Sequence, residues 1–184
     1  MNKLLVIGTV VVGLAAGVGV AMLFNSSSTE HSGEPTAKKK SEQRLTEVDR
    51  ALPEFTLASI DGSQWNADTL KGKPWVINFW ATWCPPCVEE IPSMNAAYKV
   101  LEPQGFGMLA INAAEGEEAV TAFLDKIAID FPNVLGDTNT LTNWSVKALP
   151  TTIVVTAEGD VVFQALGPRE WDDAALLQKI VDAM

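Results

Sequence analysis

The feature that most restricts the fold of this chain is a pair of cysteines placed just after a short apolar segment. The segment from Trp75 to Trp80 is almost wholly apolar, as expected for a β-strand covered on both faces. The residues from Trp83 to Cys87 follow it, and apolar side chains then recur at helical spacing as far as Leu101. This pattern predicts a strand, a turn that carries two thiols, and a helix that begins at Cys84. The expected buried face of that helix comprises Cys87, Ile91, Met94, Tyr98 and Leu101.

Two thiols at this spacing suit reversible dithiol–disulfide exchange. One thiolate attacks a substrate disulfide, and the second thiol resolves the mixed disulfide that results. Cys84 is the expected nucleophile because a helix N-terminus offers unpaired N–H groups and a dipole that lower the pKa of a thiol. Cys87 lies on the apolar helix face, so we expect it to be less exposed and to act as the resolving thiol. The alternative is that two core cysteines meet by chance.

The residues around the cysteines are expected to modulate this chemistry. Proline is tolerated in a first helical turn, because the N–H groups there have no intrahelical partner. Pro85 and Pro86 nevertheless deprive the Cys84 thiolate of donors that other residues would offer. Because stabilising the reduced form is what makes a dithiol a strong oxidant, we expect a reductant. Trp83 is expected to shield the site and to offer an apolar contact to substrates.

The rest of the chain beyond residue 51 alternates strand and helix signals. This order predicts an α/β fold, with a mixed β-sheet sandwiched between helices. The expected strands are residues 54–57, 75–80, 106–111, 151–155 and 161–165, and the last two flank a turn at 158–160 and form a hairpin. Further helices are expected over residues 117–127 and 169–183. The tryptophans expected to serve packing are Trp65, Trp75, Trp80, Trp144 and Trp171.

The N-terminal part of the chain has the pattern of a membrane anchor followed by a linker. Residues 4–24 carry no charged side chain, and a helix of that length spans roughly 30 Å, the thickness of the hydrocarbon core of a bilayer. We expect residues 1–24 to be a single-pass anchor rather than a cleaved signal peptide, because the apolar run ends in a poor cleavage site. Residues 25–50 are polar and predict a flexible linker to a domain over 51–184.

Charge and residue content exclude several other functions. The chain carries 13 Lys and Arg against 23 Asp and Glu, a formal net charge of −10, which argues against a nucleic-acid-binding surface. A zinc site needs about four ligands, and the single histidine, His31, lies in the polar linker. Covalent haem attachment would need a histidine where Val88 stands. We therefore expect neither a metal nor another cofactor.

The segment from Asn78 to Cys87 resembles the active-site segment of the thioredoxin superfamily. More narrowly, it resembles that of the membrane-tethered TlpA/ResA/CcmG family of bacterial extracytoplasmic thiol–disulfide oxidoreductases. Pro92 falls where the superfamily kinks its active-site helix, and residues 115–149 resemble the helical insertion of this branch. The residues around Pro150 lack the Gly and Glu typical of members dedicated to cytochrome c maturation. The general TlpA/ResA type is therefore the closer match, and it implies a thioredoxin-like fold over 51–184.

The resemblance also implies roles for particular residues. Pro150 would be the cis-proline that faces the cysteine pair, and with Leu149 and Thr151 it would form a platform on which an extended substrate strand pairs. Glu90 matches a glutamate that ResA-type reductases keep near their cysteines, where it raises a thiol pKa by like-charge repulsion or passes protons. The alternative for Glu90 is an acid that merely stabilises a helix N-terminus. Asn78 stands where thioredoxin has a buried Asp, so that proton acceptor is absent.

The expected function is reduction of disulfides in extracytoplasmic proteins, by an enzyme anchored in the bacterial cytoplasmic membrane with its domain facing the periplasm or the exterior. The implied partners are disulfide-containing protein substrates and a membrane thiol electron donor of the DsbD/CcdA type. A thiol peroxidase of the peroxiredoxin type is one alternative, although its Thr-x-x-Cys setting is missing because Thr82 precedes Cys84 by two. A non-enzymatic copper binder would need Cys-x-x-x-Cys and a remote His.

Overall fold

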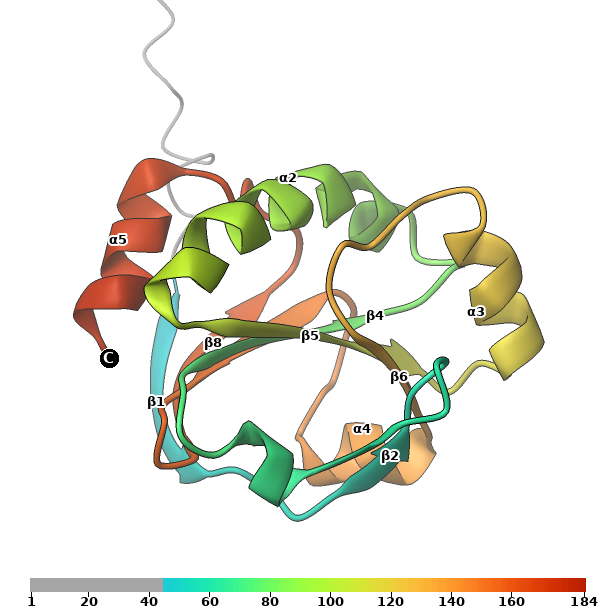
Figure 1. The fold of residues 1–184 in the computed structure, drawn as a ribbon, viewed down its shortest axis with the longest axis horizontal. Helices are drawn as coiled ribbons and strands as arrows, with labels where there is room; N and C mark the ends of the chain where they lie inside the picture. Colours follow the sequence, from blue (N-terminus) through green and yellow to red (C-terminus); the bar gives the residue numbers. More distant parts are fainter. Residues whose placement is uncertain (1–44) are drawn as a thin grey trace, which may run out of the picture. The chain divides into compact units, whose positions relative to one another are not determined.

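The computed structural model describes residues 45–184, which form a six-stranded mixed β-sheet with helices on both faces (Figure 1). Strand β4 (Trp75–Trp80) lies inside the sheet, parallel to β5 (Gly107–Ala113) and antiparallel to β7 (Thr151–Val155). The outer strands are β6 (Asn133–Gly136) beside β5, β8 (Asp160–Leu166) beside β7, and β1 (Thr46–Ala51) beside β8. A separate two-stranded sheet pairs β2 (Thr56–Ala58) with β3 (Gln64–Asn66).

The helices divide between the two faces of the large sheet. Helices α2 (Pro85–Leu101) and α5 (Ala174–Asp182) cover one face, and α4 (Thr138–Asn143) lies on the other (Figure 1). Helix α3 (Glu117–Leu124) contributes its buried Val120 to the core on the α2 side. Two short 3-10 helices complete the elements, η1 (Ala67–Leu70) and η2 (Glu102–Gln104).

Strand β4 separates two hydrophobic cores because its side chains alternate between the faces of the sheet. Val76 and Trp80 belong to the core under α2 and α5, whereas Ile77 and Phe79 belong to the core under α4 and η1. All six residues of the strand are buried. The prediction of a strand covered on both faces is therefore confirmed, and its end is held rigidly at the point where the cysteine motif begins.

Several elements agree with the sequence-based expectations. The strands over 75–80 and 151–155 have the expected bounds, and β7 and β8 form the expected antiparallel hairpin. The strands expected over 54–57, 106–111 and 161–165 overlap β2, β5 and β8. The helices expected to start at Cys84 and over 117–127 correspond to α2 and α3. The mixed α/β architecture is confirmed.

Other elements differ from the expectations. Strand β1 begins at Thr46 and Leu45 is buried, so the folded sheet extends into the last residues of the expected linker. Helix α5 begins at Ala174 rather than 169, which leaves Trp171 in the preceding loop. On α2, Tyr98 is only half-buried and Ala97 takes its place in the core. Strand β6 and helix α4 were not expected from the sequence.

The expected membrane anchor over residues 1–24 and the linker residues 25–44 lie outside the described residues. Within residues 45–184, no helix combines the length and the apolar character needed to cross a bilayer.

Candidate active site

The two cysteines lie at the start of α2 and are joined by a disulfide bond, with 1.98 Å between the sulfur atoms. Cys84 is the N-cap residue, and Pro85 and Pro86 occupy the first two helical positions. The N–H of Cys84 donates to the carbonyl of Ala81 at 3.2 Å, which closes the turn from β4 into the helix. Cys84 is 4% exposed and Cys87 is 1% exposed, the order expected for an attacking and a resolving thiol.

A cavity of about 630 Å³ opens beside Cys84. Its wall is mainly apolar and includes one charged residue, Lys147. Trp83 stands at the cavity with 67% of its surface exposed, and every other aromatic residue among 45–184 is buried or half-buried. The cavity is lined by Trp83, Cys84, Pro85, Pro86, Ala113, Ala114, Leu141, Val146, Lys147, Ala148 and Leu149.

The loop before β7 forms another part of the wall of this cavity. The Leu149–Pro150 peptide bond is cis, and Leu149 lines the cavity together with Cys84. The carbonyl of Pro150 accepts a hydrogen bond from the N–H of Gly167 at 2.9 Å. Thr151 is buried, and its hydroxyl donates to the carbonyl of Ala148 at 2.7 Å. Thr151 thus stabilises the loop through this hydrogen bond. Of the three residues of the expected platform, Leu149 is the one that lines the cavity.

Glu90 is a buried carboxyl group one helical turn after Cys87. The side-chain amide of Asn78 donates to its Oε1 at 2.9 Å, and the indole N–H of Trp171 donates to its Oε2 at 2.9 Å. The backbone N–H of Arg169 also donates to Oε2, at 3.2 Å. Burial raises the pKa of Glu90 to about 7, although these hydrogen bonds and the charge of Arg169 act to lower it. Glu90 is therefore poised to gain or lose a proton near neutral pH.

Two partners of Glu90 were not identified from the sequence as site residues. Trp171 was expected only to pack, yet it both fills the core and donates to the carboxylate. Asn78 was noted only as the loss of an acid, but its amide bridges Glu90 and the hydroxyl of Thr152 at 2.9 Å. The buried carboxyl group of this fold therefore comes from the helix rather than from the strand.

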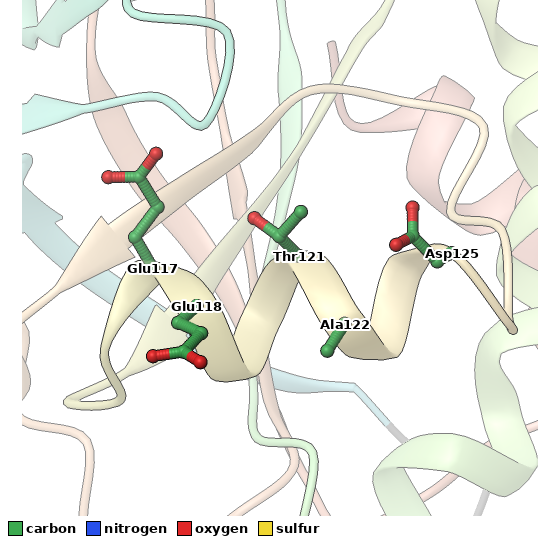
Figure 2. A pocket seen from close by; sticks show the side chains of 5 residues that line it. All are labelled: Glu117, Glu118, Thr121, Ala122 and Asp125. Carbon is green, nitrogen blue, oxygen red and sulfur yellow. The ribbon is translucent and has the colours of Figure 1, made fainter.

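A second hollow lies on the exposed side of α3. Figure 2 shows the side chains of Glu117 and Glu118 at the start of this helix and that of Asp125 at its end. Acidic residues in a first helical turn are stabilised by the helix dipole. This acidic surface includes neither cysteine and is not part of the site. It is lined by Glu117, Glu118, Thr121, Ala122 and Asp125.

The sheet order, the Cys-x-x-Cys pair at the start of α2 and the cis-proline loop facing it define a thioredoxin-like protein with a redox-active cysteine pair. The model of the AhpC/TSA family matches residues 48–164, more than half of the chain. The chain belongs to the AhpC/TSA family and is similar to relatives called thiol–disulfide oxidoreductase ResA. The expected membership of the TlpA/ResA type is confirmed.

Two ResA relatives illustrate the extent of the match. ResA of Bacillus subtilis is 40% identical over 111 residues, which cover 60% of this chain and 62% of the relative. ResA of Bacillus cereus is 32% identical over 136 residues, which cover 73% of this chain and 79% of the relative. The match to the first relative therefore leaves more than a third of its length uncovered.

Solved structures show the same architecture. A thioredoxin-family thiol:disulfide interchange protein from Chlorobium tepidum is 27% identical, with a TM-score of 0.63, and the match covers 74% of this chain and 99% of that one. StoA from Bacillus subtilis has a TM-score of 0.60 at 22% identity, with 70% of this chain and 99% of that one covered. The likeness to StoA supports the fold alone.

Proposed function

We propose that the chain is a thiol–disulfide oxidoreductase that reduces disulfide bonds of extracytoplasmic proteins. The observation that carries the proposal is the Cys84–Cys87 disulfide at the start of α2, with Cys84 on the wall of an apolar cavity. In the reduced enzyme, the Cys84 thiolate attacks one sulfur of a substrate disulfide, and the other substrate sulfur leaves as a thiolate. Cys87 then attacks Cys84, which releases the second substrate thiol and restores the enzyme disulfide. Two electrons pass to the substrate.

The direction of the reaction follows from the donors around Cys84. Pro85 and Pro86 have no N–H group, and the N–H groups of Cys87 and Val88 donate to the carbonyl of Cys84 at 3.0 and 3.1 Å. Few backbone donors are therefore left to stabilise a Cys84 thiolate. A dithiol whose thiolate is weakly stabilised is a poor oxidant and a better reductant. This supports reduction rather than disulfide donation.

The cavity beside Cys84 supports a protein substrate bound in extended form. Leu149, which precedes the cis-proline, and the exposed Trp83 of the cysteine loop both line the cavity. An extended segment placed between them brings its own cysteine to Cys84 and its apolar neighbours to the cavity wall. Pro150 shapes this platform through its cis bond.

We propose that the carboxyl group of Glu90 acts as a proton relay. Its carboxyl group is buried one turn beyond Cys87, and its pKa lies at about 7 because of that burial. A group that titrates at the working pH transfers protons efficiently in both directions. We assign it to the protons that Cys87 gives up and regains when the dithiol is oxidised and reduced.

The experiment that tests the function is reduction of insulin by the full chain with a chemical reductant as electron source. We expect catalytic precipitation of insulin, no activity after Cys84→Ser, and a reduction potential below about −150 mV, because the thiolate is poorly stabilised. A wild-type chain that leaves insulin intact, or a potential on the oxidant side, contradicts reduction. Turnover of hydrogen peroxide in place of insulin points to the alternative thiol peroxidase.

We propose that the enzyme is anchored in the bacterial cytoplasmic membrane, with its domain in the periplasm or outside the cell. The support for this location is the run of uncharged apolar residues 4–24, together with Lys3 before them, which favours a cytoplasmic N-terminus. An enzyme in this place draws its electrons through the membrane, so we assign recharging to a thiol donor of the DsbD/CcdA type.

Membrane fractionation checks this location. We expect the full chain to sediment with membranes and to withstand alkaline carbonate, because residues 4–24 hold it in the bilayer. A chain that starts at Leu45 should be soluble and keep its activity in the insulin assay. Release of the full chain by carbonate, or recovery of a chain shortened at its N-terminus, argues for a peripheral or cleaved form.

A further inference from the structure

A second carboxylate, that of Glu115, accepts two hydrogen bonds from the loop that carries Cys84. The backbone N–H of Thr82 donates to Oε2 of Glu115 at 2.7 Å, and the hydroxyl of Thr82 donates to Oε1 at 2.5 Å. One residue thus gives both of its donors to the two oxygens of one carboxylate. Hydrogen bonds to an ionised acceptor are shorter and stronger than neutral ones. The contact joins segments that are 33 residues apart in the sequence.

The turn that holds Glu115 is itself fixed at both ends. Asn112, at the end of β5, donates its amide to Oε2 of Glu115 at 2.8 Å and accepts the N–H of Glu115 at 3.1 Å. Ala114 adopts the left-handed backbone conformation, with φ at 60°, which is unfavourable for a residue with a Cβ atom. Its N–H donates to the carbonyl of Gly136 at 3.1 Å. The fold thus maintains an unfavourable turn whose outcome is that Glu115 faces Thr82.

The two hydrogen bonds between Thr82 and Glu115, called the clamp below, also join two parts of the cavity wall. Thr82 precedes Trp83 and Cys84, which form one wall, and Glu115 follows Ala113 and Ala114, which form another. Asn112 lies directly opposite Trp80 in the pairing of β4 with β5. The carboxylate therefore joins the segments that follow β4 and β5, beyond Trp80 and Asn112, the last pair of residues that the two strands share.

We propose that Glu115 is a positioning residue for Cys84, which fixes the loop between β4 and α2 and so holds the attacking sulfur at the helix N-terminus. The inference rests on the proposed function and deepens it, because Glu115 acts on Cys84 through Thr82, two residues before it in the chain. A thiolate gains from the helix dipole only while it stays at the first turn, because the effect falls off within that turn. A loose loop weakens this stabilisation and raises the pKa of Cys84.

A simple effect of charge has the opposite sign, which allows a test. Removing a nearby negative charge favours a thiolate and lowers the pKa of Cys84. Loss of the clamp raises that pKa instead. The direction in which Glu115→Gln shifts the pKa of Cys84 therefore distinguishes a positioning role from a direct effect of charge. Thr82→Val removes one hydrogen bond of the clamp and no charge at all, so only the positioning role predicts that it raises the pKa as well.

The experiment measures alkylation of Cys84 by iodoacetamide against pH in the reduced full chain. We expect Glu115→Gln to raise the pKa of Cys84 by about one unit and so to slow its alkylation at neutral pH about tenfold. Thr82→Val should shift the profile less, in the same direction, and the double variant should react no more slowly than Glu115→Gln. Thr82→Ser keeps both donors and should match the wild type.

Glu118→Gln is the matched control, because it removes an equal charge from the exposed face of α3 (Figure 2). A lowered pKa in Glu115→Gln, an unchanged profile in Thr82→Val, or effects that add in the double variant overturns the proposal. Thermal unfolding shows whether each variant is folded, and Thr82→Val and Thr82→Ser decide the matter if Glu115→Gln is not. Alkylation needs no substrate, so a wild type that fails to reduce insulin refutes the proposed function and leaves this measurement valid.

Discussion

Replacement of Cys87 by alanine is expected to leave each enzyme molecule covalently joined to its substrate after a single attack by Cys84. The attacking sulfur keeps its place on the cavity wall, whereas the buried thiol that resolves the mixed disulfide is gone. Turnover of insulin should fall to the uncatalysed rate. Non-reducing electrophoresis should show a mixed disulfide that reductant dissolves, and mass spectrometry of the captured proteins identifies the physiological substrates.

The fold should tolerate this change. Loss of one buried sulfur atom costs about 1 kcal/mol by comparison with other small deletions in protein cores. Cys84→Ala is the matched control, because it keeps Cys87 and should capture nothing. Capture by Cys84→Ala and none by Cys87→Ala reverses the roles that the N-cap position and the exposure of Cys84 indicate.

Glu90→Gln is expected to make the protein more stable above neutral pH. Burial raises the pKa of Glu90 from its ordinary value of 4.5 to about 7, so the folded chain binds a proton that the unfolded chain has already lost. Stability is therefore full below pH 4.5 and falls as the pH rises through the folded pKa. The loss amounts to about 3 kcal/mol once both states are ionised. Glutamine reproduces the protonated form and carries no such penalty.

Urea unfolding of the oxidised protein at several pH values checks this expectation. The variant and the wild type should have similar free energies of unfolding in acid, and the variant should be more stable at alkaline pH. Glu89→Gln is the matched control, since Glu89 is the exposed neighbour on the same helix. Parallel pH curves for Glu90→Gln and the wild type contradict the raised pKa. The same variant should also change the pH dependence of Cys84 alkylation if Glu90 exchanges protons with the cysteines.

The local features of the site were predictable from the sequence. The apolar strand, the cysteine pair and the helix that follows lie close together in the chain, and their pattern is strong enough to show the start of α2. Strand β1 was not predicted, because it lies at the edge of the sheet and buries little of its surface. The side chains of Thr46–Ala51 alternate between exposed and half-buried, so the segment carries no apolar run to mark it.

The long-range contacts of the site were not predictable from patterns. Trp171 follows Glu90 by 81 residues, and nothing in its spacing distinguishes an indole that packs from one that also donates to a carboxylate. The pair of Thr82 and Glu115 depends on the register of β4 and β5 and on a left-handed turn at Ala114. The missing acid at Asn78 was visible in the sequence, as was Glu90, but the hydrogen bond between the two side chains appears only in the structure.

The contacts of Glu90 with Arg169 and Trp171 can form only late in protein synthesis, because these partners lie 79 and 81 residues after Glu90. Both cysteines leave the ribosome well before the segment that supplies two of the three donors to Glu90. Until that segment is made, the carboxyl group lacks these partners. A fragment that stops short of Arg169 thus contains the whole Cys-x-x-Cys motif and still lacks two of the three donors to Glu90.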